Sequence, residues 1–213
     1  AFLFSAILSS GIKSKRLLRS IVFFPNIINP IGLAVMWSFI YEHDSGLLNN
    51  FLRAIGLGGL ARTWAAPDRL FWSLLVALVW IYVGFFVVIL MAGFDRIPND
   101  VIESAKIEGA NDVRIFFSIK VPMIWDVLTM AIVLWGIMAL KEFAFLYSWG
   151  GGQAMPPEGA QNLAVYMYVM AFGTREPVYR MGYSTAMGVV MLIMVILMVL
   201  IVRSLMRRES VEY

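Results

Sequence analysis

The sequence predicts an all-α protein whose helices form a polytopic bundle in a membrane. Hydrophobic residues make up 61% of its 213 residues and charged residues only 15%, and the mean hydropathy is +0.79. This composition lies outside the range of ordinary soluble domains. Most apolar residues are also collected into runs of about 20, the length that an α-helix needs to cross a bilayer. We therefore interpret residues 1–213 as a single transmembrane domain, in which charged loops separate the spans.

Residues 1–10 are predicted to be a partial span. They are apolar or small, but they supply only about half of the length that a bilayer requires. We expect that the chain begins within a spanning helix and that further spans precede Ala1. The next segment is basic and is therefore predicted to be cytoplasmic, since lysine and arginine are retained on that side of a membrane. Its basic residues are Lys13, Lys15, Arg16 and Arg19.

Four complete spans are predicted to follow this basic loop. The first of them contains two prolines and two asparagines near its start. We therefore expect a kinked helix, whose freed backbone groups are satisfied by neighbouring helices. The last span carries small residues that allow close helix packing. The predicted spans lie at about 21–41, 70–93, 127–147 and 182–202.

Basic residues orient these spans. Residues 11–20, the loop 95–126 and the C-terminal tail hold 11 lysine and arginine residues, whereas the loops 42–69 and 148–181 hold five. By the positive-inside rule, the first group is cytoplasmic and the second is external. The first external loop contains an amphipathic segment that we expect to lie partly on the membrane surface. The second contains a short apolar helix.

The charged loop at 95–126 is predicted to form two short helices. Pro98 ends the preceding apolar run, and Asp100 is placed to cap a new helix with Glu103 in capping-box register. Gly109 then ends that helix, because glycine readily adopts the left-handed conformation of a helix end. Another cap follows at once, and the second helix should carry an apolar face. The residues of that face are Phe116, Phe117 and Ile119.

Nine residues of this loop have the order and spacing of a known motif. They are Glu103, Ser104, Ala105, Glu108, Gly109, Ala110, Phe116, Ile119 and Pro122. At these residues the loop resembles the EAA loop of membrane subunits of binding-protein-dependent ABC importers, and the chain resembles permeases of the maltose and glycerol-phosphate type. The loop departs from the pattern at Ser104, where alanine is usual, at Glu108, where aspartate is usual, and at Asp126, where a second proline is usual.

A second match lies in the external loop, where Gly46, Asn49 and Leu52 follow a pattern that recurs in this family. The resemblance implies a bundle of the ABC importer permease type with a cytoplasmic coupling helix. It implies import of a sugar, an oligosaccharide or a polyol derivative across the plasma (inner) membrane of a bacterium or archaeon. The nine residues of the EAA-type loop would couple the permease to ATPase subunits. The sequence does not indicate which solute is carried.

The resemblance also implies partners and cofactors. ATP and Mg²⁺ would bind to two copies of a cytoplasmic ABC ATPase, so this subunit would be neither an enzyme nor a cofactor-binding protein. A second, similar permease and an extracytoplasmic solute-binding protein would complete the complex, which membrane lipids would surround.

The composition argues against catalysis, metal binding and nucleic-acid binding. Cysteine is absent and His43 is the only histidine, which leaves few ligands for a zinc site. We find no nucleophile with a nearby base and no phosphate-binding glycine motif. The net charge of +3 is small and spread along the chain. The alternative function is a subunit of a secondary transporter or channel, which would place acidic residues within several spans.

Lys141 and Glu142 form the one adjacent charged pair inside a predicted span. Neighbouring positions on a helix point about 100° apart, so the two side chains should not readily neutralise each other. The long lysine side chain can extend toward the surface, whereas the glutamate has a shorter reach. We therefore expect Glu142 to face the translocation path or, alternatively, to form a structural bond with a neighbouring helix. Lys141 and Tyr147 complete the predicted path residues.

Overall fold

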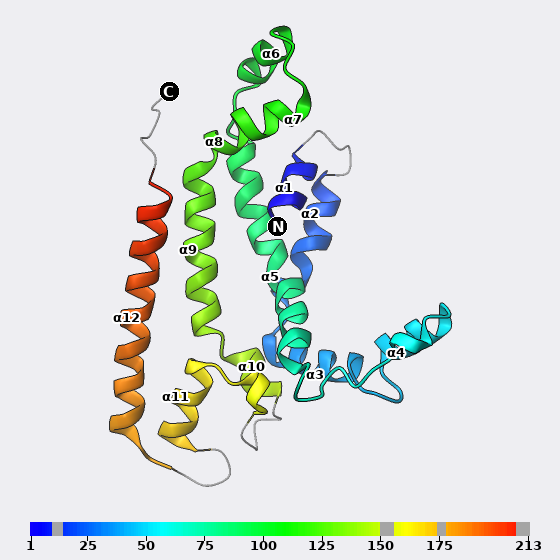
Figure 1. The fold of residues 1–213 in the computed structure, drawn as a ribbon, viewed down its shortest axis with the longest axis vertical. Coiled ribbons are helices and arrows are strands. Elements are labelled where there is room, and N and C mark those ends of the chain that lie inside the picture. Colours follow the sequence, from blue (N-terminus) through cyan, green and yellow to red (C-terminus); the bar gives the residue numbers. More distant parts are fainter. Residues whose placement is uncertain (10–14, 150–155, 174–177, 208–213) are drawn as a thin grey trace. The chain divides into compact units, whose positions relative to one another are not determined.

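The computed structural model describes residues 1–9, 15–149, 156–173 and 178–207, and every regular element within these ranges is helical (Figure 1). The prediction of an all-α fold is confirmed. The long helices are α5 (Leu70–Phe94), α9 (Trp125–Lys141) and α12 (Met181–Leu205). The shorter helices are α1 (Phe2–Leu8), α2 (Lys15–Phe23), α3 (Pro30–Ile40), α4 (Leu47–Ala54), α6 (Asn99–Ile107), α7 (Asp112–Ile115), α8 (Val121–Met123), α10 (Ala144–Trp149) and α11 (Leu163–Phe172). Four short helical turns complete the set: η1 (Phe24–Ile27), η2 (Gly58–Leu60), η3 (Phe116–Lys120) and η4 (Glu158–Ala160).

Three segments of 25 residues are long and apolar enough to cross a membrane. A straight helix of this length rises about 37 Å, more than the roughly 30 Å of a hydrocarbon core. These segments overlap three of the predicted spans. They are Leu70–Phe94, Trp125–Trp149 and Met181–Leu205.

The predicted span at 21–41 is not one continuous helix. The α2 helix ends at Phe23, η1 follows, and α3 begins anew at Pro30. Asn29 caps α3, because its side chain accepts a hydrogen bond from the backbone N–H of Ile31 (2.9 Å). Proline is favourable in the first turn of a helix but disrupts the interior. The residues that predicted a kink therefore divide the segment into two helices, which are long and apolar enough for a span only when they are taken together.

The chain divides into two compact units. Unit 1 comprises residues 1–26, 82–137 and 196–213, and unit 2 comprises residues 27–81 and 138–195. The long helices contribute residues to both units. The predicted coupling loop belongs to unit 1, whereas the predicted path residues and the first external loop belong to unit 2.

In unit 1, α1 and α2 pack against the second half of α5. Gly84 of α5 lies directly against α2, and a Cβ atom at this position would overlap the backbone of Val22 and Phe23. Glycine is therefore required there for close helix contact. The buried residues of this cluster are Leu8, Val87 and Met91.

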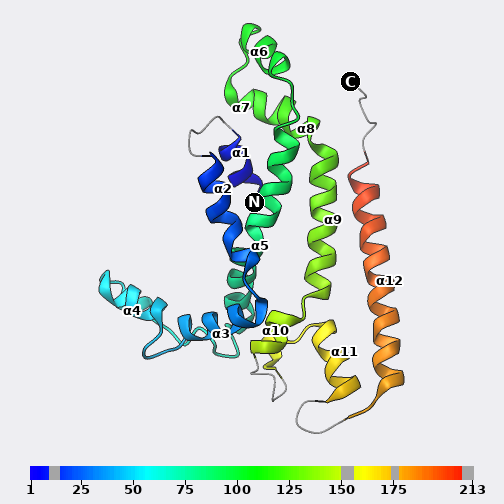
Figure 2. The ribbon, with the colours of Figure 1, turned by 180° about the vertical axis from the view of Figure 1, so that it is seen from behind.

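The end of α12 runs beside the start of α9 in the same unit, as both views show (Figures 1 and 2). The indole N–H of Trp125 donates to the carbonyl of Met206 (2.7 Å). Further along, Gly136 of α9 leaves room for the side chain of Met198. This hydrogen bond and this close contact hold the two helices together.

In unit 2, α3 packs against α10. Leu33 and Ala34 of α3 are buried, and so is Phe145 of α10. At the end of α3, the hydroxyl of Tyr41 donates to the carbonyl of Ser73 in α5 (2.9 Å). The core of this unit is therefore built from helices that precede and follow the coupling loop in the sequence.

Candidate functional site

The predicted coupling loop begins with α6. Pro98 occupies the N-cap position without a side-chain cap bond, and Asp100 lies in the first turn of the helix. The prediction that Asp100 caps this helix is therefore wrong. Its carboxylate lies instead near the positive end of the helix dipole, where an acid is favourable without capping. Glu103 follows on the same helix and is exposed to solvent.

Gly109 ends α6 in a left-handed conformation with φ of +83°. Its N–H donates to the carbonyl of Lys106 (3.0 Å), and the N–H of Ala110 donates to the carbonyl of Ala105 (2.9 Å). These two bonds form a Schellman motif, which satisfies carbonyls at the end of a helix. Ala105 is buried. The motif explains the glycine at 109 through its left-handed backbone, and burial explains the small side chain at Ala105.

Asn111 begins the second part of the loop. Its side chain accepts a hydrogen bond from the N–H of Arg114 (2.8 Å), which caps α7. The predicted second helix then continues as a π-helical turn, η3, and as α8, which contains Pro122. A π-helical turn holds an extra residue compared with an α-helical turn. Side chains before and after it therefore do not follow one helical face.

Phe116 anchors this part of the loop in the core of unit 1. Its ring centre lies 5.6 Å from that of Phe2 and 6.2 Å from that of Phe94. Phe117 is exposed instead, so the prediction of one apolar face shared by Phe116, Phe117 and Ile119 is wrong at Phe117. Ile119 is half-buried. Adjacent side chains of a helix point in different directions, and Phe116 is the one that packs against Phe2 and Phe94.

The outward surface of the loop combines acidic and apolar side chains. Glu103, Ser104 and Glu108 are exposed. Ile107 lies among them and is 87% exposed, and Val113 of α7 is also exposed. Sequence reasoning missed these two residues, although an isoleucine between charged neighbours was an available signal. An exposed apolar side chain ringed by polar groups suits contact with a partner protein.

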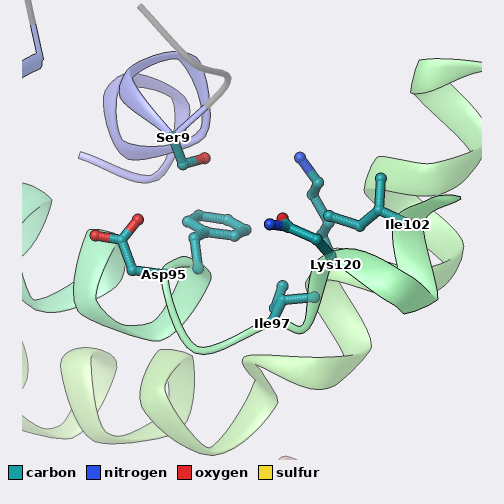
Figure 3. Close-up of a pocket in the computed structure, with 7 residues that line it drawn as sticks. Ser9, Asp95, Ile97, Ile102 and Lys120 are labelled. Carbon is teal, nitrogen blue, oxygen red and sulfur yellow. The ribbon is translucent and has the colours of Figure 1, made fainter.

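A small cavity lies between α1 and the base of the loop, within unit 1 (Figure 3). Ser9 and Lys120 point into it, whereas the carboxylate of Asp95 points away from Lys120. Its volume of about 150 Å³ is smaller than the roughly 300 Å³ of a typical ligand pocket. The cavity is large enough to hold water molecules. In the part of the chain that the structure describes, no group of three His, Asp or Glu side chains is arranged to hold a metal ion.

Glu142 lies at a break between α9 and α10 rather than inside a continuous helix. It is buried, and its carboxylate accepts a hydrogen bond from the N–H of Phe145 (3.3 Å). Asn162 joins this break to the start of α11, because it donates to the carbonyl of Glu142 (2.5 Å) and accepts from the N–H of Val165 (2.9 Å). The helical geometry assumed for the Lys141–Glu142 pair is therefore wrong, since the helix ends at Lys141.

Lys141 and Asp126 lie at opposite ends of α9. Lys141 is exposed, and its ammonium group forms no hydrogen bond or ion pair with the residues that the structure describes. Asp126 is exposed in the first turn of the helix, where a carboxylate is favourable near the positive end of the dipole. This position gives a local role to a residue that departs from the family pattern.

Tyr147 belongs to an aromatic cluster next to the break. Its ring stacks on that of Phe143, with centres 5.1 Å apart and an angle of 17°, and meets the ring of Tyr168 edge-on at 5.1 Å. Tyr168 also contacts Phe172 at 5.0 Å. The cluster joins α10 to α11. Sequence reasoning could not pair these rings, because Tyr147 and Tyr168 are 21 positions apart in the sequence and lie on different helices.

The whole chain is similar to one family of transport proteins. Residues 1–211 match the family of binding-protein-dependent transport system inner membrane components. The chain belongs to this family. The resemblance that the EAA-type loop indicates is confirmed.

Several relatives in this family are described as permeases. The probable ABC transporter permease protein YesP of Bacillus subtilis (strain 168) is 30% identical over 202 residues, which cover 94% of this chain and 63% of that protein. The alpha-glucoside transport system permease protein AglF of Rhizobium meliloti (strain 1021) is 35% identical, with coverage of 84% and 52%. The diacetylchitobiose uptake system permease protein NgcF of Streptomyces coelicolor is 32% identical, with coverage of 85% and 50%. The chain thus spans half to about two thirds of the length of these relatives.

Solved structures of a transporter share the fold. A chain of a bacterial ABC transporter involved in the import of the acidic polysaccharide alginate matches with a TM-score of 0.74 at 19% identity, over 98% of this chain and 72% of that chain. A chain of the alginate transporter in complex with a periplasmic protein bound to an alginate pentasaccharide matches with a TM-score of 0.73 at 19% identity, over 97% and 70%. The predicted fold of an ABC importer permease is confirmed.

Proposed function

We propose that the chain forms part of the permease of an ATP-driven ABC importer for a sugar, an oligosaccharide or a polyol derivative. Membership of the family supports the importer class. The relatives AglF and NgcF, described as permeases for alpha-glucosides and diacetylchitobiose, support a carbohydrate as cargo. Three apolar segments of sufficient length support a location in the inner membrane of a bacterium or archaeon.

The geometry around Gly109 is the observation that carries the coupling role. The Schellman motif turns the chain at the end of α6, and Phe116 anchors the following turn in the core of unit 1. Glu103 and Ile107 therefore project from a firmly held element. We infer that Glu103 pairs with a basic residue of an ATPase subunit and that Ile107 enters an apolar depression beside it. Movement of the ATPase would then reach α5 and α9, which flank the loop.

The complete importer would contain several further subunits. We infer a second, similar permease, two copies of a cytoplasmic ABC ATPase and an extracytoplasmic solute-binding protein. ATP and Mg²⁺ would bind to the ATPases, so this chain would form the path and transmit movement without catalysis of its own. The solved alginate transporter in complex with a periplasmic protein supports the solute-binding partner.

The path would involve Lys141, Glu142 and Tyr147 in different roles. Glu142 is occupied by its bond to the N–H of Phe145, so it would shape the path by holding the break between α9 and α10. Lys141 is exposed and can donate up to three hydrogen bonds to sugar hydroxyls. Tyr147 would supply an aromatic wall together with its cluster. Of the two roles predicted for Glu142, this assignment therefore takes the structural bond and not direct contact with the solute.

Reconstitution of the complex tests the proposed function. The full-length permease is assembled in proteoliposomes with candidate partner permease, ATPase and solute-binding protein, and uptake of a panel of labelled sugars is measured. We expect uptake of at least one sugar with ATP and none with a non-hydrolysable analogue. Uptake that follows an ion gradient without the ATPase would identify a secondary transporter or channel instead.

A further inference from the structure

A row of large apolar side chains on α4 is exposed to solvent. Leu47, Phe51 and Ile55 are 68%, 60% and 50% exposed. They are four residues apart, so they line one side of the helix and its C-terminal end. We call these three residues the α4 row. A short helix with one such side is suited to the boundary between an apolar phase and water.

The polar side of α4 is bonded to its own loop. Asn49 is fully buried. Its side-chain N–H groups donate to two loop carbonyls (2.9 Å each), and its carbonyl oxygen accepts from the indole N–H of Trp64 (2.8 Å). Arg53 donates to the carbonyl of Asp44 (3.0 Å). Because the polar side is occupied within the loop, the α4 row is the side that remains for another surface.

Hydrogen bonds also hold this loop at the level of the first turn of α5. The hydroxyl of Ser73 donates to the carbonyl of Trp64 (2.8 Å), and the hydroxyl of Tyr41 donates to the carbonyl of Ser73 (2.9 Å). Ser73 lies three residues after the start of a membrane-spanning candidate and is therefore near the membrane surface. Both views show α4 extending sideways from these turns (Figures 1 and 2). Phe71 and Trp72 of the same turn are exposed.

We propose that α4 is an interfacial anchor whose apolar row enters the lipid headgroup region beside the start of α5. The helix lies along the membrane surface, with the row roughly 5–10 Å deep at the boundary between headgroups and acyl chains. Lipid is the occupant because the hydrogen-bonded loop holds α4 at the same level as the exposed apolar side chains of the first turn of α5. The anchor fixes the depth of the external loop and does not depend on the solute that is transported.

Single cysteines test this proposal, because residues 1–213 contain none and any cysteine outside them is first replaced by serine. Phe51→Cys and Asp44→Cys are each labelled with a bimane fluorophore in the full-length protein, reconstituted in phosphatidylcholine and phosphatidylglycerol vesicles. Asp44 is a matched control in the same loop, since its side chain is 89% exposed and is not on α4. Quenching is measured with lipids that carry a doxyl group near the headgroup and with aqueous iodide. Leu47→Cys and Ile55→Cys repeat the measurement at the other two positions of the row.

We expect doxyl lipid to quench the probes in the α4 row about threefold more strongly than the probe at Asp44, and iodide to show the reverse order. Equal access of iodide to Phe51 and Asp44 would place the row in water and overturn the proposal. Protection of the row from both quenchers would show that protein covers it, which also overturns the proposal. Agreement among the three row positions guards against misfolding of any one variant.

Discussion

The backbone at Gly109 imposes a conformational constraint rather than a steric one. A Cβ atom added at this residue would meet no other atom within 4 Å, so there is space for a side chain. The φ of +83° is nevertheless left-handed, which costs a residue with a side chain about 1–2 kcal/mol. The coupling loop therefore depends on this glycine for its turn and not for its small size.

Replacement of Gly109 by alanine should loosen the loop without displacing any neighbour. We expect local hydrogen exchange over residues 99–123 to be faster by roughly tenfold, which corresponds to about 1.4 kcal/mol. Gly109→Val should increase the exchange rate further. Sugar-stimulated ATP hydrolysis of the reconstituted complex should fall in parallel. Gly182→Ala is the matched control, because its site in α12 is equally open but lacks the positive φ. Equal behaviour of the two alanine variants would contradict this account.

Glu42 in the first external loop gives a prediction for pH. The backbone N–H and the hydroxyl of Ser45 donate to its carboxylate (2.5 and 2.8 Å). These bonds, of which the backbone bond has the larger effect, lower the pKa of Glu42 from 4.5 to about 2. Because the folded-state pKa is depressed, the stabilising effect is complete above pH 4.5 and disappears as the pH falls toward 2. NMR titration of the labelled side chain in wild type and in Ser45→Ala should show the pKa rising when the hydroxyl is removed; an unchanged pKa would contradict this.

Lys141 and Glu142 should respond differently to substitution. Glu142→Gln keeps a side-chain oxygen for the N–H of Phe145 and should preserve uptake, whereas Glu142→Ala removes the cap and should cost about 0.5–2 kcal/mol. Lys141→Met should lower sugar uptake with little change in thermal stability, because the exposed ammonium group has no hydrogen bond or ion pair with the residues that the structure describes. Uptake and melting temperature of the three variants are compared. If Glu142→Gln assembled normally but lost uptake, the carboxylate of Glu142 would be part of the translocation path.

Among the elements, the first external loop is organised by one buried side chain. Asn49 bonds to segments on either side of it in the sequence, including the carbonyl and the N–H of Arg62 (2.9 and 3.2 Å). Position 46 of the same loop requires a glycine, because a Cβ atom at Gly46 would overlap the backbone of Glu42. Gly46 and Asn49, two of the three residues of the pattern that also includes Leu52, therefore have a structural explanation in this chain.

Asn49→Ala should unfold this loop locally. The variant leaves the indole N–H of Trp64 and the N–H of Arg62 without their acceptor, and each such loss costs about 1–3 kcal/mol when the group is buried. We expect faster proteolysis within residues 42–68, while the spans remain protected. Asn50→Ala is the control, since Asn50 is exposed on the same helix. Similar cleavage rates for the two variants would mean that Asn49 is not the organising residue.

Across the whole molecule, features that depend on neighbouring residues were predictable from the sequence. Features that depend on contacts between residues distant in the sequence were not. Uniform hydrophobicity predicted the helices α5 and α12, and Gly109 predicted the end of α6 because a Schellman motif is made within a few residues. The break at Glu142 was not predictable in this way. The apolar run passes through it, and Asn162, which bonds to the break, lies 20 residues further along the chain. The divergence of Phe116 and Phe117 likewise depends on packing against Phe2 and Phe94.

The orientation of the chain in the membrane provides the last prediction. Because basic residues resist transfer to the outside, the loop at 95–126 should be cytoplasmic and the loop at 42–69 external. Asn99→Cys and Asp44→Cys are both exposed positions in a chain without cysteine. In intact cells an impermeant thiol reagent should label Asp44→Cys and spare Asn99→Cys, and both should react after the membrane is opened. Labelling of Asn99→Cys from outside would show that the orientation is the opposite one. The EAA-type loop would then lie on the other side of the membrane from any cytoplasmic ATPase.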